Sequence, residues 1–234
     1  MSKGRAERTR PTGSLRLKGR KNMEENKDVG MPAQAVRTGG AGKKMSTKDY
    51  VTVGVFALLH AAVLFIMGAI GGLSAVGFPL FGLVGFIPGG IIFVYIVTKV
   101  PKRGVVFALG AISALAYFLM GAYGPVPLFV LAAGIVGEAV VSAGKYKSFS
   151  LIVVGYVLFA LLFWFGFMSP IAFSMEGYMD SAIESYGADY MATLAGYVQG
   201  PLLIALGATT AVGAVAGTLL GRRLFAKHFS RIGG

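Results

Sequence analysis

Apolar residues are distributed very unevenly along the chain. Residues 1–45 contain no apolar run longer than a residue or two, whereas long apolar runs recur from Tyr50 onward. Each run approaches the roughly 20 residues that a helix needs to cross a bilayer core. The pattern predicts an all-α, polytopic membrane protein: a disordered tail at 1–45, then a six-transmembrane-helix bundle at 46–234. The expected spans are 50–70, 78–98, 105–121, 126–143, 149–169 and 200–221.

Composition agrees with a membrane protein and locates the excess charge. Hydrophobic residues make up 55% of the 234 residues and charged residues 14%, with a mean hydropathy of +0.70. Soluble domains approach a quarter charged residues. The net charge is +12, but 13 of the 22 Lys and Arg residues lie within positions 1–49. We interpret this basic tail as a solvated extension. Attraction to nucleic acid or anionic lipid is the alternative, and of these we expect membrane lipid, not nucleic acid, as a partner.

The second span is the least regular of the six. Pro79 and the run Pro88-Gly89-Gly90 interrupt it, so part of 71–90 is expected to form a loop or a broken helix. Irregular backbone at membrane depth survives only where protein or water satisfies its polar groups. This segment is therefore a place to look for a cavity.

Basic and non-basic loops alternate along the whole chain. Cytoplasmic loops of membrane proteins are enriched in Lys and Arg. The alternation predicts a multi-pass protein of the cell membrane with both termini in the cytoplasm. The basic segments are 99–103, 145–147 and 222–227, and the segments without Lys or Arg are 71–77, 122–125 and 170–199.

Small residues recur at helical spacing in the first and last spans. Gly54, Ala57 and Ala61 share one stripe of the first span, and the last span carries Gly213, Gly217 and Gly221. Small side chains let helix backbones approach closely within a membrane. Each stripe indicates either packing within the bundle or docking to a separate membrane partner.

Two ionisable residues lie inside apolar spans. Glu138 occurs near the cytoplasmic end of the fourth span, which favours a structural role, paired with Lys145 or Lys147 or neutral. His60 lies in the middle of the first span, where packing is expected more often than proton transfer.

The 170–199 loop is acidic and aromatic. Glu176, Asp180 and Glu184 repeat every fourth residue and would form a stripe on a helix. The accompanying tyrosines are typical either of the aromatic belt at a membrane surface or of an outward-facing pocket. The candidate substrate-binding residues here and nearby are Trp164, Tyr178, Tyr186, Glu176 and Tyr123.

Catalytic motifs are missing. The chain has no H-E-x-x-H, no Walker A lysine and no Gly-x-Ser-x-Gly motif, and it contains no cysteine. We therefore expect no enzymatic activity, no bound metal and no cofactor, and any ATP-driven role requires separate ATPase subunits.

Several short motifs resemble a known family. Ser46-Thr47-Lys48-Asp49-Tyr50 opens the first span, and the chain continues with Pro88-Gly89-Gly90, then Lys99-Val100-Pro101-Lys102-Arg103-Gly104, Gly137-Glu138 and Gly144-Lys145-Tyr146-Lys147-Ser148. Over about 45–230 this arrangement resembles the Trep_Strep group, also called MptD-type substrate-binding (S) components of energy-coupling factor (ECF) transporters.

The resemblance implies a six-helix protein that binds a vitamin or other micronutrient from outside. It implies docking to a transmembrane coupling protein through small residues of the first helix, here Gly54, Ala57 and Ala61, while two ATPases power release inward. The alternatives are a stand-alone structural or regulatory membrane protein and a secondary transporter that couples ions through Glu138 or His60.

Overall fold

Helices form nearly all of the part of the chain that the structure describes. The computed structural model describes residues 45–198 and 200–229, and the predicted tail at 1–45 lies outside them except for Met45. No strand occurs among the described residues, so the all-α prediction is confirmed there. The helices are α2 (Thr47–Gly72), α3 (Gly77–Lys99), α4 (Val105–Leu119), α5 (Pro125–Ala143), α6 (Phe149–Ala172), α7 (Tyr178–Tyr186), α8 (Ala188–Val198) and α9 (Pro201–Phe229).

Five helices are long and apolar enough to cross a membrane by length and composition. They are α2, α3, α5, α6 and α9. The predicted third span is also an apolar helix, α4, but it has only 15 residues. It covers about 22 Å at 1.5 Å per residue. The predicted loop at 170–199 contains two further helices, α7 and α8.

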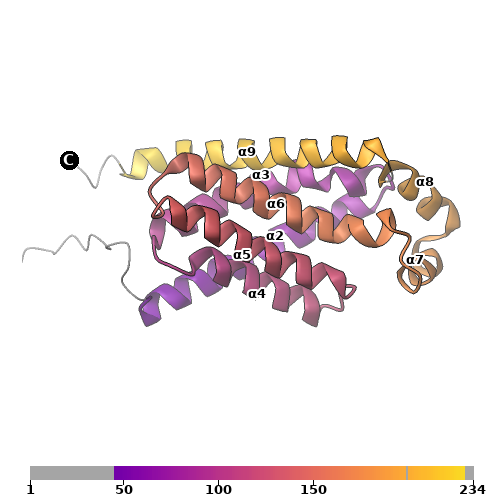
Figure 1. Cartoon of the computed structure of the whole chain (residues 1–234), viewed down its shortest axis with the longest axis horizontal. Helices are drawn as coiled ribbons and strands as arrows, with labels where there is room; N and C mark the ends of the chain where they lie inside the picture. The colour runs from indigo at the N-terminus through magenta and orange to yellow at the C-terminus, as the bar shows by residue number, and fades with distance from the viewer. Residues whose placement is uncertain (1–44, 199, 230–234) are drawn as a thin grey trace, which may run out of the picture. The chain divides into compact units, whose positions relative to one another are not determined.

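The six longer helices contact one another in a closed circuit. α2 packs on α3, α3 on α9, α9 on α6, α6 on α5, α5 on α4, and α4 again on α2. Figure 1 shows these helices running alongside one another, with α7 and α8 together at one end. A circuit of this kind encloses one shared core, which aromatic residues of α3 and α6 fill, including Phe86, Phe93, Tyr156 and Phe159.

The predicted break in the second span is wrong for its second half. A turn at 73–76 does separate α2 from α3, but α3 then continues through Pro88 to Lys99. Pro79 lies in the first turn, where a helix needs no amide donor. Gly90 is required because a Cβ there would lie 2.8 Å from the backbone of Gly217. Gly90 thus permits close contact between α3 and α9.

The glycine stripe of α9 serves this internal packing. A Cβ on Gly217 would lie 2.5 Å from the carbonyl oxygens of Phe86 and Ile87, and one on Gly221 would lie 3.1 Å from Ile91. Of the two uses predicted for the stripe, packing within the bundle is the one observed. The backbones of α3 and α9 touch because neither helix has a side chain between them.

The small residues of α2 differ in their surroundings. Ala57 and Ala61 are buried, at 0% and 6% exposure, on the side of α2 that packs on the bundle. Gly54 is only half-buried, and a Cβ there would have open space around it. Of the three residues predicted to dock a partner, only Gly54 therefore borders the outward face of α2. Large apolar side chains, including Val51, Val55 and Leu58, occupy that face.

Candidate functional site

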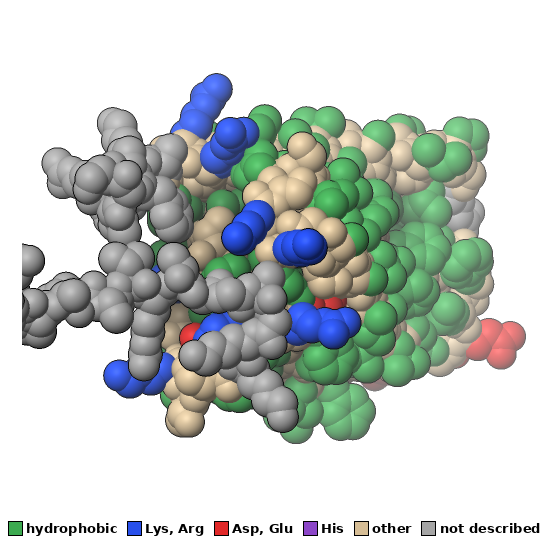
Figure 2. All heavy atoms as spheres, turned by 60° about the vertical axis from the view of Figure 1, so that its left-hand side comes forward, with side chains coloured by type: hydrophobic (Ala, Val, Ile, Leu, Met, Phe, Trp, Pro, Cys, Tyr) green, Lys and Arg blue, Asp and Glu red, His purple; other side chains and the backbone are tan. Residues whose placement is uncertain are grey.

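The two ends of the helix bundle differ in charge. Within the described residues, the Lys and Arg side chains lie at the end where α2 begins and α3, α5 and α9 end, and Figure 2 shows them gathered there. The acidic residues of the segment 173–189 lie at the opposite end, beside α7 and α8. We refer to these as the basic end and the acidic end.

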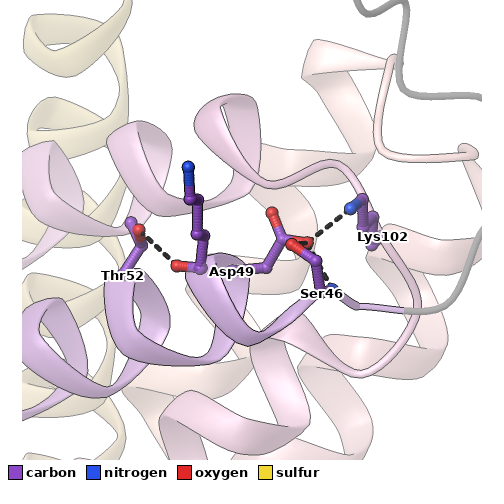
Figure 3. A network of polar contacts seen from close by, with 5 residues as sticks. Ser46, Asp49, Thr52 and Lys102 are labelled. Atoms are coloured by element: carbon purple, nitrogen blue, oxygen red, sulfur yellow. Dashed lines mark hydrogen bonds and ion pairs between the residues drawn. The ribbon is translucent and has the colours of Figure 1, made fainter.

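A capping interaction and an ion pair tie α2 to the next basic loop. The backbone amide of Ser46 donates to Oδ2 of Asp49 at 2.6 Å, and the Ser46 hydroxyl donates to the same oxygen at 2.6 Å. Lys102, from the loop between α3 and α4, forms an ion pair with this carboxylate (Figure 3). The carboxylate thus serves the helix start and the loop together.

At the basic end, Glu138 of α5 binds the backbone at the start of α4. Its carboxylate accepts hydrogen bonds from the amides of Gly104 at 2.7 Å, Val106 at 2.9 Å and Phe107 at 3.3 Å. These amides belong to the start of α4, where a helix leaves its donors unpaired. The structural role predicted for Glu138 matches this geometry, but its partners are amides and Tyr146 rather than Lys145 or Lys147, whose side chains are exposed.

Tyr146 completes this arrangement from the loop between α5 and α6. Its hydroxyl donates to Oε1 of Glu138. Burial raises the pKa of Tyr146, and the hydrogen bond to Glu138 raises it further, so the phenol remains a donor at neutral pH. Three motifs that are distant in the sequence, around Gly104, Glu138 and Tyr146, therefore meet at one structural junction.

A cavity lies at the acidic end, between the helices of the circuit. It has a volume of about 460 Å³, which is within the usual size range for small-molecule sites. The last third of α2 and the start of α3 contribute lining residues, and α7 contributes Tyr178 and Tyr186. The described residues that line it include no Asp, Glu, His, Lys or Arg: Leu64, Phe65, Gly68, Ala69, Gly72, Leu73, Phe78, Phe81, Tyr117, Ala122, Tyr123, Val126, Phe163, Phe167, Tyr178 and Tyr186.

Aromatic rings build the inner wall of this cavity. Tyr117 of α4 meets Phe163 and Phe167 of α6 edge to face, with ring centroids 5.4 and 5.3 Å apart. Phe81 of α3 meets Phe167 at 5.9 Å in the same manner. The Tyr117 hydroxyl donates to the carbonyl of Ala61 at 3.3 Å, which fixes the ring between α4 and α2. Edge-to-face packing gives the wall a defined shape.

Tyrosines of α7 and the loop before α5 form the cover. Tyr123 and Tyr178 pack edge to face with centroids 5.2 Å apart. Tyr186 stacks at 5.4 Å on Tyr190, whose hydroxyl donates to the carbonyl of Gly72 at 2.8 Å. Burial raises the pKa of Tyr178 to about 12, so its ring stays neutral at physiological pH. The cover is therefore anchored to the end of α2 and carries uncharged aromatic groups.

The structure brings together three of the five predicted substrate-binding residues. Tyr123, Tyr178 and Tyr186 line the cavity. Trp164 is buried elsewhere: its indole nitrogen donates to the carbonyl of Pro79 at 3.0 Å, and its ring lies beside Gly82 and Gly207. Glu176 is exposed just before α7 and does not line the cavity.

Sequence reasoning missed the inner wall. Tyr117, Phe163 and Phe167 lie within apolar spans, where aromatic residues most often serve general packing. Their spacing offered one signal, since 163 and 167 are four residues apart and share a helix face. The sequence did not show that α4 would meet this face.

His60 is enclosed in the core rather than in the cavity. It is fully buried, and its ring packs edge to face against Phe159 at 5.6 Å and Tyr156 at 6.2 Å. Neither ring nitrogen has a hydrogen-bond partner within the described part of the chain. His60 therefore packs in the core as expected, but, among the described residues, without the hydrogen bond that is usual for a lone histidine in a span.

The apolar helices are typical of an integral membrane protein, and the described part of the chain is all-helical in class. Residues 47–231 match the model of one family, described as a hypothetical bacterial integral membrane protein (Trep_Strep). The chain belongs to this family. A search of curated proteins and a search of solved structures each gave no match.

Proposed function

We propose that the chain is the substrate-binding (S) component of an ECF-type transporter. It captures a small molecule of the vitamin or micronutrient class outside the cell, without catalysing a reaction on it. A membrane coupling protein and two ATPases then drive its release inward. The observation that carries this proposal is the cavity at the acidic end, on the side of the bundle opposite the described cations.

The charge distribution supports an outward-facing cavity. Basic residues are retained on the cytoplasmic side of bacterial membranes. The basic end, with its exposed Lys99, Arg103, Lys145 and Lys147, is then the cytoplasmic end, where it also meets anionic lipid. The cavity opens toward the outside, where a nutrient arrives.

Impermeant labelling tests this orientation. The chain has no native cysteine, so single cysteines can be introduced without background. We expect Glu184→Cys at the acidic end to react with an impermeant maleimide in intact cells. We expect Lys145→Cys at the basic end to react only after permeabilisation. The reverse pattern would place the cavity on the cytoplasmic side and contradict the proposal.

The outward face of α2 is the proposed contact with the coupling protein. Gly54 borders this face beside exposed Val51 and Leu58, and a Cβ added there would have no neighbouring atom within 4 Å. Close approach of a partner helix at Gly54 would be blocked by a bulky substitution. Ala57 and Ala61 contribute indirectly, because their small size sets the packing of α2 on the bundle.

Affinity purification of the tagged full chain from its native membrane tests the partners. We expect a membrane coupling protein and two ATPases to co-purify, and Gly54→Trp to weaken their retention by about tenfold, as loss of 1.4 kcal/mol would give. Ile204→Trp is the matched control, since Ile204 is a lipid-exposed residue of α9 at 77% exposure. Recovery of the chain without ATPases would favour a stand-alone role.

The geometry gives less support to ion-coupled transport. That mechanism requires an ionisable group that exchanges its proton or ion along the pathway. The oxygens of Glu138 are held by three amides and Tyr146 at the basic end, and His60 is enclosed by aromatic rings.

A further inference from the structure

We propose that the cavity binds a small organic cation with an aromatic or apolar body. This inference rests on the proposed function, in which the cavity is the substrate site, and it names the chemical class of that substrate. It follows from three features of the acidic end: the aromatic wall, the neutral lining and the position of the charges.

The walls consist largely of aromatic rings, and their polar side-chain groups are tyrosine hydroxyls. Tyr117, Phe163 and Phe167 form the inner wall, and Tyr123 and Tyr178 close the outer side. The face of each ring carries a partial negative charge that attracts cations, and weakly hydrated ammonium groups gain most from such cages. A cation entering this cavity loses water but meets several rings.

The same lining offers little to an anion. No Lys, Arg or His is among the described residues that line the cavity, and α7 contributes no free positive charge. Carboxylates and phosphates are normally held by Arg, Lys or clusters of amides. An anionic ligand would lose its hydration, and neutral tyrosine hydroxyls would be the side-chain donors left to replace it.

The charges around the cavity favour positive ligands. Asp180 and Glu184 are exposed on α7, and Glu176 and Asp189 flank that helix. The described Lys and Arg residues lie at the basic end, at the other end of the long helices. This separation exceeds the Debye length, so salt screens their effect on the cavity. The acidic residues therefore raise the local concentration of cations at the cover.

Three aromatic probes that differ in charge test the inference. The full chain in nanodiscs is titrated with benzyltrimethylammonium, 2-phenylethanol and phenylacetate by equilibrium dialysis. We expect the cation to bind about tenfold more tightly than the alcohol, and phenylacetate to bind more weakly than either. Equal affinity for the three, tighter binding of phenylacetate, or no binding of the cation would overturn the inference.

Substitutions in the cover test whether ring faces hold the probe. We expect Tyr178→Leu and Tyr186→Leu each to weaken binding of benzyltrimethylammonium by about fivefold, whereas Tyr178→Phe, which keeps the ring, stays within about twofold. Tyr197→Leu on α8 is the matched control, because Tyr197 does not line the cavity. An equal loss in Tyr178→Phe and Tyr178→Leu, or in the control, would contradict a role for the rings.

The acidic residues predict a salt-dependent component. Raising the salt concentration is expected to weaken cation binding by about threefold in the native chain. The double variant Asp180→Asn, Glu184→Gln should lose most of that dependence. These measurements use the chain without partners, so a preference for the neutral or anionic probe would overturn the ligand class and leave the transport proposal standing. Absence of co-purifying ATPases would contradict the transport proposal and leave the ligand class standing.

Discussion

Replacing Glu138 with alanine is expected to destabilise the bundle by about 2–4 kcal/mol, because amides at the start of α4 and the Tyr146 hydroxyl lose their acceptor. The hydrogen bonds from Gly104, Val106 and Tyr146 are part-buried, so water compensates these orphaned donors only in part. Glu138→Gln keeps an acceptor oxygen but loses the charge that complements the helix start, and should cost less.

The effect of Glu138→Ala can be measured as the free energy of unfolding in mixed micelles. Glu184→Ala is the matched control, since Glu184 is an exposed acid at the other end, and its change should stay within about 0.5 kcal/mol. Tyr146→Phe removes one of the four donors and should cost about 1 kcal/mol. Equal stability of Glu138→Ala and Glu184→Ala would show that the carboxylate does not hold the start of α4.

Gly213→Ala is expected to destabilise the protein by about 1–3 kcal/mol. A Cβ on Gly213 would overlap the carbonyl oxygen of Leu83 and lie 2.9 Å from that of Gly82, so the backbones of α3 and α9 must separate. This loss outweighs the gain of about 1 kcal/mol in helix propensity that alanine brings.

Gly207→Ala is the control, because it makes the same substitution in the same helix without the clash. A Cβ at Gly207 would lie 3.6 Å from the nearest atom, on Trp164, which is ordinary contact. Gly207→Ala should be neutral or slightly stabilising in the same unfolding measurement. If the two variants unfold alike, close contact of α3 and α9 does not determine stability.

The sequence predicted the helices better than it predicted their contacts. Span lengths and the alternation of basic loops follow from local composition. The six longer helices begin and end within a few residues of the predicted spans, apart from the C-terminal extension of α9, whereas α7 and α8 lie in the predicted loop. Pro88-Gly89-Gly90 suggested a break because proline and glycine weaken an isolated helix. The helix continues here because Gly90 packs closely on Gly217 of α9, a contact that no local sequence pattern reveals.

The candidate site was predicted in its cover but not in its wall. Tyr123, Tyr178 and Tyr186 occur outside the apolar spans, so their type and position were informative. Trp164 resembled them in chemistry but is used to bond the Pro79 carbonyl. Whether an aromatic residue inside a span faces a neighbour, lipid or a cavity depends on helix rotation, which hydropathy does not encode.

The short length of α4 has a consequence for the surrounding lipid. Its 15 residues cover about 22 Å, roughly 8 Å less than the hydrocarbon thickness of an average bilayer. If α4 crosses the bilayer, the acyl chains next to it must compress, because a span that is too short is accommodated by local thinning of the bilayer. Thinner membranes would therefore stabilise the protein around α4, and the same local thinning would lower the resistance of the bilayer to any rotation of the bundle within it.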